Sequence, residues 1–165
     1  MNVVLVAAIS ADGYIARHKN ELADWTTKED KQYFVRRTKE LGVMIMGRTT
    51  FQTIGRALPG RRMIVMTRSP DKYAADNVEF TDLQPVQLLK QLESEAVESV
   101  AVVGGARIYT EFATAGLLDE LDLSIVDIEL GDGIELFDQN VELGLDYESG
   151  EYLSDTVAVH VFTVS

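Results

Sequence analysis

The chain has 165 residues, of which 46% are hydrophobic and 25% are charged, a composition typical of a folded globular domain. Its formal net charge of −12 argues against a nucleic-acid partner, and the absence of a long apolar run argues against a membrane span. Because there is no cysteine and there are only two histidines, we expect no disulfide and no bound metal, and the lack of cysteine fits a cytoplasmic protein. The length of the chain predicts one domain over residues 1–165.

Hydrophobic patterns predict eight strands. Continuous apolar runs are typical of strands buried on both faces, and alternation is typical of strands with one exposed face. In chain order, the predicted strands cover residues 3–9, 43–46, 63–66, 78–80, 99–103, 121–128, 145–152 and 156–164. Between them, Ser10–Asp24 and Leu130–Asp138 are expected to be loops, and the first is long enough to suggest a functional role.

Four helices are expected between these strands. The first begins after Thr26 or Thr27, whose hydroxyl groups can cap it, and Gly42 ends it. A short helix near Thr50 and helices over residues 83–95 and 106–114 follow. Because strands and helices alternate and the chain ends in a hairpin, we predict an α/β domain. Its central, mainly parallel eight-stranded sheet has an antiparallel C-terminal strand and about four flanking helices.

Basic residues are concentrated in one part of the chain. The segment from Lys28 to Lys72 holds 11 of the 15 basic residues, whereas the residues after position 73 include 20 acidic and two basic ones. A basic segment in an acidic chain would attract a small anionic ligand. Segregation of charge without any ligand is the alternative.

Small or charged residues follow three of the predicted strands, in Gly47-Arg48, Thr67-Arg68-Ser69 and Gly104-Gly105-Ala106-Arg107. The carboxyl ends of parallel strands meet at one edge of a sheet, where ligands bind in open α/β folds. Glycine permits close approach to the backbone, and helix N-termini and arginines attract phosphate. The three strand ends together indicate one extended anionic ligand such as a dinucleotide, although tight turns with solvated arginines would give the same pattern.

Asp30 falls in the first turn of the first predicted helix. A solvated carboxylate that favours the helix dipole is the simplest interpretation of the local sequence. Trp25 is the only tryptophan, and we expect it in the core or in the wall of a cleft.

Several strings of the sequence, in this order and spacing, resemble the dihydrofolate reductase family: VVLVAAISADGYIA, DW followed by KEDKQYFVRRT, VMIMGRTTFQTIGRALPGRRMIVMTRS and VAVVGGARIYTEF. The resemblance covers most of the chain, from Val3 to about Phe137. The segment Ser10–Ala16 and the string LGDGIELF are more similar to the related reductase domain of riboflavin biosynthesis. The family resemblance implies reduction of 7,8-dihydrofolate to tetrahydrofolate by NADPH.

The resemblance also implies roles for the acid and its neighbours. Asp30 takes the place of the buried acid of the pterin pocket, with Trp25 beside it and Ser124 where the family usually has a threonine; these three are the expected catalytic residues. Asp30 would bind the pterin and favour its protonation, and Arg61 would bind the α-carboxylate of the substrate. The expected substrate-binding residues are Val6, Ala7, Lys31, Phe34, Thr53, Ile54, Arg61 and Val103.

For NADPH, the resemblance implies a site at the three strand ends, with Arg48 and Arg68 favouring the 2′-phosphate. The expected cofactor-binding residues are Ala8, Ile15, Gly47, Arg48, Thr49, Thr50, Thr67, Arg68, Ser69, Gly104, Gly105, Ala106, Arg107, Ile108 and Tyr109. Ala106 replaces a usual glycine.

Two departures leave the substrate open. Lys31 stands at a usually apolar position, and Asp12-Gly13 follows the riboflavin-type pattern. A reductase of a ribosylaminopyrimidine phosphate and a non-catalytic nucleotide-binding protein of the same fold are therefore the alternatives to a dihydrofolate reductase. We expect a small-molecule substrate, no nucleic-acid or membrane partner, and a monomer or a homodimer.

Overall fold

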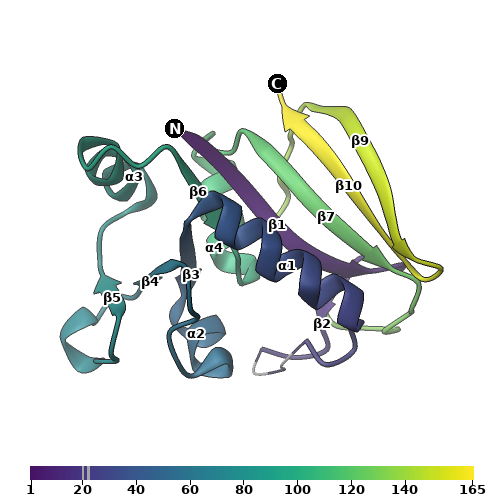
Figure 1. Cartoon of the computed structure of the whole chain (residues 1–165), viewed down its shortest axis with the longest axis horizontal. Helices are drawn as coiled ribbons and strands as arrows, with labels where there is room; N and C mark the ends of the chain where they lie inside the picture. The colour runs from purple at the N-terminus through teal and green to yellow at the C-terminus, as the bar shows by residue number, and fades with distance from the viewer. Residues whose placement is uncertain (20, 22) are drawn as a thin grey trace.

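The computed structural model describes residues 1–19, 21 and 23–165, and in this part of the chain eight strands form one large sheet. These strands are β1 (Asn2–Ser10), β3 (Val43–Gly47), β4 (Arg62–Met66), β5 (Val78–Thr81), β6 (Ser99–Val102), β7 (Glu120–Val126), β9 (Leu145–Ser154) and β10 (Val157–Val164). Their order across the sheet is β5-β4-β3-β6-β1-β7-β10-β9 (Figure 1).

The directions of the strands follow the predicted pattern. All neighbours from β5 to β7 are parallel, whereas β10 is antiparallel to both β7 and β9. The long apolar runs of β1, β3 and β6 occupy the middle of the sheet, as expected for strands covered on both faces. The predicted α/β architecture, with a mainly parallel sheet and an antiparallel C-terminal strand, is confirmed.

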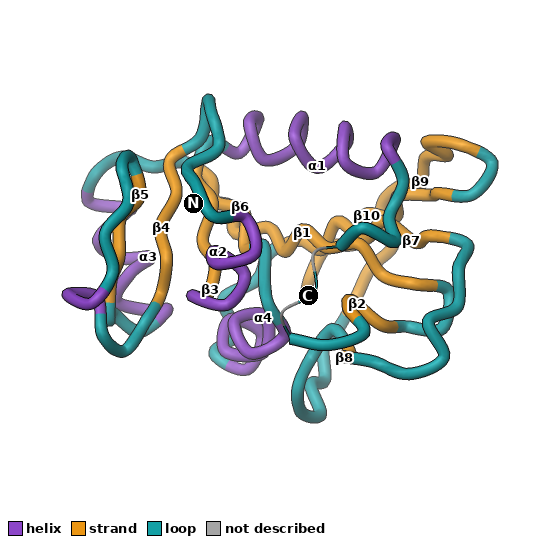
Figure 2. The backbone as a smooth tube through the Cα atoms, turned by 90° about the horizontal axis from the view of Figure 1, so that it is seen from below, coloured by secondary structure: helices purple, strands orange, loops and turns teal. Residues whose placement is uncertain are grey.

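Helices cover both faces of the sheet. The helices of the described chain are α1 (Lys28–Leu41), α2 (Arg48–Ile54), α3 (Pro85–Ser94), α4 (Ala106–Thr114) and a 3-10 turn at Pro70–Lys72. Apolar side chains of α1 and α2 pack with one core cluster, and those of α3 and α4 pack with the other. Figure 2 shows α1 and α4 on opposite sides of the sheet. In the described residues, no helix is both long enough and apolar enough to cross a membrane.

Both predicted loops contain a short strand, which corrects the sequence interpretation. Strand β2 (Tyr14–Ala16) and strand β8 (Ile134–Glu135) form a separate two-stranded antiparallel sheet. Strands this short carry no readable period, and their pairing depends on contacts distant in sequence. Positions 20 and 22 of the predicted first loop lie outside the described residues.

The boundaries of α1 follow its capping residues. The Thr27 hydroxyl accepts a hydrogen bond from the Asp30 N–H at 3.2 Å, and the Gly42 N–H donates to the Thr38 carbonyl at 2.9 Å. Gly42 has a φ of 84°, a conformation that glycine adopts without strain. The caps set the ends of α1, and the buried residues Asp30, Tyr33 and Leu41 mark the face that packs on the sheet.

Candidate active site

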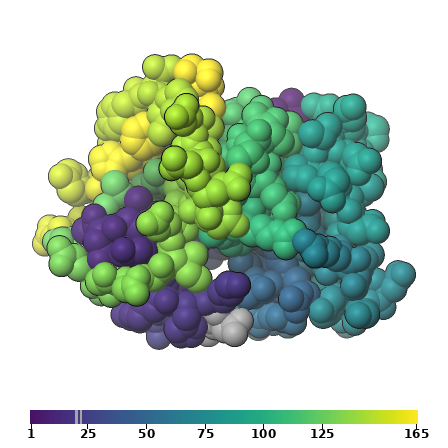
Figure 3. All heavy atoms as spheres, turned by 180° about the vertical axis from the view of Figure 1, so that it is seen from behind, coloured from purple at the N-terminus to yellow at the C-terminus, as the bar shows by residue number. Residues whose placement is uncertain are grey.

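A cleft of about 1320 Å³ opens at the carboxyl ends of the parallel strands, and strand-end residues of β3, β4 and β6 line it. Figure 3 shows it from behind as a hollow between the N-terminal segment and the segment around α2. Ligand pockets commonly measure about 300–1,000 Å³, so this cleft has room for two ligands side by side.

We call the first part of the cleft the cofactor half; it consists of Gly47–Thr50, Thr67–Ser69 and Gly104–Tyr109. The Gly47 N–H donates to the Gly104 carbonyl at 2.9 Å, which joins two of the three strand ends. A Cβ atom on Gly47 would lie 3.0 Å from Cγ1 of Ile108, and Gly104 has a φ of 113°. A side chain on Gly47 would press on Ile108, and the positive φ of Gly104 favours glycine.

The first turn of α4 also faces the cofactor half. Ala106 is the first residue of this helix and has a negative φ, so the replacement of the usual glycine causes no strain. Among the described residues, no side chain caps the N-terminus of α4, which leaves backbone N–H groups available to an anion.

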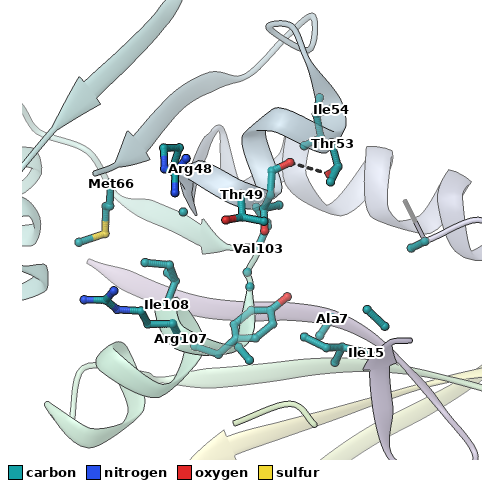
Figure 4. A pocket seen from close by; sticks show the side chains of 18 of the residues that line it. Ala7, Ile15, Arg48, Thr49, Thr53, Ile54, Met66, Val103, Arg107 and Ile108 are labelled. Atoms are coloured by element: carbon teal, nitrogen blue, oxygen red, sulfur yellow. Dashed lines mark hydrogen bonds between the residues drawn. The ribbon is translucent and has the colours of Figure 1, made fainter. Parts of the chain in front are cut away.

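Arginines surround one end of the cofactor half. In Figure 4, Arg48 from α2 and Arg107 from α4 lie at the same end of the cleft, near Met66. The Arg48 guanidinium lies over the Tyr73 ring, with Cζ 5.7 Å from its centroid, and Arg107 pairs with Glu111. Within the described part of the chain, Arg48 and Arg68 form no ion pair, so their charges are free to bind an anionic ligand.

We call the second part the substrate half; it consists of Asp30, Lys31, Phe34, Ile54, Arg61 and Ser124. Asp30 is only 6% exposed and Ser124 only 2% exposed. Burial raises the pKa of the Asp30 carboxyl, while the hydroxyl groups of Ser124 and Thr26 and the ammonium group of Lys31 favour its ionised form. Asp30 therefore retains a proton at a higher pH than an exposed aspartate would, so the solvated-carboxylate interpretation is wrong.

Two cations border the substrate half. Arg61 donates from Nη1 to the Thr38 hydroxyl at 3.1 Å and from Nε to the Pro59 carbonyl at 3.1 Å. It has no carboxylate partner among the described residues, and its partial burial lowers its pKa. Lys31 lines the same half from the exposed side of α1.

Trp25 is the one candidate residue that does not line the cleft. All of the other predicted catalytic, substrate and cofactor residues line the cleft, whereas Trp25 does not. It is 8% exposed and packs with Val126 and Val157 in a small separate core cluster. Its indole N–H is buried and has no hydrogen-bond partner among the described residues.

Asp12 joins two loops outside the cleft. Its carboxylate accepts hydrogen bonds from the Ser10 hydroxyl at 2.5 Å, the Gly131 N–H at 2.8 Å and the Leu130 N–H at 3.1 Å. These bonds lower the pKa of Asp12. Because neither Asp12 nor Gly13 lines the cleft, this part of the riboflavin-type pattern does not contact a ligand in the cleft directly.

The sequence analysis missed a further wall of the cofactor half, which consists of Lys72, Tyr73 and the segment 81–84. The segment follows β5, so the rule that ligands bind at strand ends could have found it. Tyr73 stacks on Phe80, with ring centroids 5.9 Å apart. Nothing in the sequence around Tyr73 indicated that it lines the cleft.

Comparisons with known proteins identify the family of this chain. The sequence model of the family described as dihydrofolate reductase matches residues 2–140. Dihydrofolate reductase type 3 of Salmonella typhimurium is 32% identical over 131 residues, which cover 79% of this chain and 75% of that protein.

Two solved structures share the fold. Dihydrofolate reductase from Enterococcus faecalis, complexed with NADP(H), has a TM-score of 0.77 at 19% identity and covers 99% of this chain and 96% of its own. A deaminase/5-amino-6-(5-phosphoribosylamino)uracil reductase from Thermotoga maritima has a TM-score of 0.80 at 18% identity, covering 99% of this chain and 56% of its own. At these identities the structures show the fold alone. The family model and the Salmonella relative show that the chain belongs to the dihydrofolate reductase family.

Proposed function

We propose that this protein reduces 7,8-dihydrofolate to 5,6,7,8-tetrahydrofolate with NADPH. The observation that carries the proposal is the buried Asp30 in one half of a cleft whose other half is built to hold phosphate groups. Membership of the family and the NADP(H) complex of the Enterococcus structure add support.

The cofactor half fits a dinucleotide. Gly47, Gly104 and Gly105 bring backbone to the cleft wall, and Arg48, Arg68 and Arg107 supply charge for phosphates. When bound, NADPH supplies the hydride, so the protein contributes binding, orientation and electrostatics.

In this proposal, Asp30 orients the pterin and promotes its protonation. An ionised carboxylate accepts hydrogen bonds from the amino and ring N–H groups of a pterin. The negative charge of this carboxylate favours protonation of the substrate at N5, with water carrying the proton, and the raised pKa of Asp30 makes the carboxylate a stronger base. Ser124 keeps a hydroxyl group beside this acid.

Arg61 binds the substrate tail in this proposal. Its guanidinium is held by Thr38 and Pro59 and has donors left for a carboxylate. A guanidinium presents two parallel N–H donors to a carboxylate, so it suits the α-carboxylate of the glutamyl tail.

A second candidate is the reduction of a ribosylaminopyrimidine phosphate. The observation that favours it is Lys31, an additional cation in the wall of the substrate half. An ammonium group would bind a phosphate on the substrate, whereas the aminobenzoyl group of dihydrofolate gains nothing from a charge at this position.

A steady-state assay of NADPH oxidation with each substrate tests the two candidates. We expect turnover of dihydrofolate at micromolar concentrations and little or none of the pyrimidine phosphate. The variant Lys31→Leu should leave KM for dihydrofolate within about threefold, because a rim charge on a neutral group contributes little. Lys28→Leu is the matched control, since Lys28 is also exposed on α1 but does not line the cleft. Turnover of the pyrimidine phosphate alone would replace the first candidate by the second.

A further inference from the structure

A charged network joins α1 to β7 beside the candidate active site. Asp122 of β7 is 1% exposed, and its Oδ2 accepts hydrogen bonds from the Tyr33 hydroxyl at 3.0 Å and from Nε of Arg37 at 2.6 Å. Nη2 of Arg37 also donates to Glu120 at 2.6 Å. We call Tyr33, Arg37, Glu120 and Asp122 the α1–β7 network. None of them was a candidate from the sequence.

The α1–β7 network lies on the same face of α1 and the same side of β7 as Asp30 and Ser124. Asp30, Tyr33 and Arg37 are spaced by three and four residues, so they lie on one face of α1. Asp122 and Ser124 are two residues apart on β7, so their side chains point to the same side of the sheet. Tyr33 therefore meets Asp122 one helical turn from the place where Asp30 meets Ser124.

Apolar residues occupy the strands on both sides of Asp122. It pairs in register with Val6 of β1 and with Val161 of β10. The charged and titratable groups that meet it are therefore Tyr33 and Arg37 from α1 and Glu120 from its own strand. Arg36 lies over the other side of the Tyr33 ring, 5.3 Å from its centroid.

One oxygen of Asp122 lacks a donor. Oδ1 is buried and accepts no hydrogen bond from the described residues when both carboxyl groups are ionised. Glu120 is close enough to supply the missing donor when it is protonated, and burial together with Asp122 raises the pKa of Glu120 to about 7. Asp122 is thus held by Tyr33 and Arg37 through one oxygen, and its second oxygen is buried beside Glu120.

Such a network is suited to fixing geometry. A buried ion pair contributes little net stability compared with apolar residues of the same volume, because both charges lose their hydration. Apolar contacts allow a helix several similar positions on a sheet, whereas hydrogen bonds from Tyr33 and Arg37 to one carboxylate allow only a narrow range. The network lies between the two elements that carry Asp30 and Ser124.

We propose that Asp122 is a positioning residue for the reductase reaction, because its bonds to Tyr33 and Arg37 hold Asp30 of α1 against Ser124 of β7. The residue does not touch the cleft and acts through α1. This inference rests on the proposed function only in naming the reaction, since the placement of Asp30 can be measured without turnover.

The first test compares two arginines. Arg62 forms a similar cluster, with Glu79 at 2.6 Å and Glu95 at 2.5 Å, but on strand β4 and away from the cleft wall. We expect Arg37→Met to lower kcat by about tenfold or more while leaving KM for NADPH unchanged. Arg62→Met should leave both constants within about twofold. Arg37→Lys, which keeps one cationic donor, should recover part of kcat.

The second test measures the acid itself. Tyr33→Phe removes the hydrogen bond to Asp122 without changing any charge. If this bond holds α1 against β7, its loss should loosen α1 and let water reach Asp30. We expect the titration midpoint of the Asp30 carboxyl, followed by carbon-13 NMR in the ligand-free protein, to fall by about half a pH unit or more. Asp30→Asn identifies the resonance by its loss. Asp122→Asn serves as a second variant if Arg37→Met does not fold.

The two proposals fail in different ways. A wild-type protein that does not reduce dihydrofolate would reject the proposed function, and the NMR titration would still decide the role of Asp122. If Arg37→Met and Arg62→Met have the same kcat, and Tyr33→Phe leaves the Asp30 midpoint unchanged, the network only stabilises the fold and our inference is wrong.

Discussion

The two halves of the cleft are built in different ways. The cofactor half is formed by backbone at strand ends, by glycines and by the N-terminus of α4, with arginines around it. The substrate half is formed by side chains from several elements: Asp30, Lys31 and Phe34 of α1, Ile54 of α2, Arg61 before β4 and Ser124 of β7. Backbone features need particular residues at short spacing, so they can be recognised locally, whereas facing side chains depend on contacts between distant segments. The cofactor half is therefore the part that short sequence strings predict, and the proposed substrate depends on the half whose contacts they do not predict.

The largest effect is expected from Asp30→Asn in the substrate half. An amide cannot carry the negative charge or return a proton, so turnover of dihydrofolate at neutral pH should fall by about 100-fold or more. The dissociation constant for NADPH should change by less than about twofold, because Asp30 lies outside the cofactor half. Steady-state kinetics and a fluorescence titration measure the two quantities. Unchanged turnover would contradict the assignment of Asp30.

Arg61→Ala should produce the next largest effect. Loss of a bidentate partner for the substrate carboxylate should raise KM for dihydrofolate by about 10- to 100-fold and leave KM for NADPH unchanged. Arg56→Ala is the matched control, since Arg56 is exposed nearby but does not line the cleft. Equal KM values for the two variants would show that Arg61 does not bind the tail.

Arg48→Ala tests the cofactor half. If Arg48 binds the 2′-phosphate, its loss should raise KM for NADPH by about tenfold and change KM for NADH by less than about twofold. The ratio of the two KM values is the measurement. Equal increases with NADPH and NADH would place Arg48 on a phosphate that both cofactors share.

The smallest effect concerns stability. The pKa of Asp30 is raised in the folded state, so its favourable contribution is complete below about pH 4 and is lost as the pH rises through the folded-state value. Asp30→Asn removes this penalty, so its Tm should exceed that of the wild type by about 2–4 °C at pH 7. The difference should disappear near pH 4. A lower Tm for the variant at pH 7 would show that the charged form is stabilised by its neighbours.

The sequence predicted most of the fold, and every predicted site residue except Trp25 lines the cleft, but much of the rest of the cleft wall was not predicted. The strands of the large sheet could be predicted because their apolar or alternating runs are long, whereas β2 and β8 are too short to show a period. Glycines and arginines at strand ends indicated the cofactor half. The partners of Asp122 could not be predicted, because Tyr33 and Arg37 meet it only when α1 packs on a strand that lies far along the chain.

The position of β1 has a consequence for how the chain folds during synthesis. This strand is synthesised before both of its neighbours, β6 and β7, with Val3 beside Val100 and Ala8 beside Ser124 in the sheet. About a hundred residues separate β1 from each neighbour along the chain, so this apolar strand stays without its partners while they are synthesised. Pairing over such distances makes folding slow and leaves the nascent chain open to aggregation. We therefore expect the yield of folded protein to depend on chaperones that bind β1.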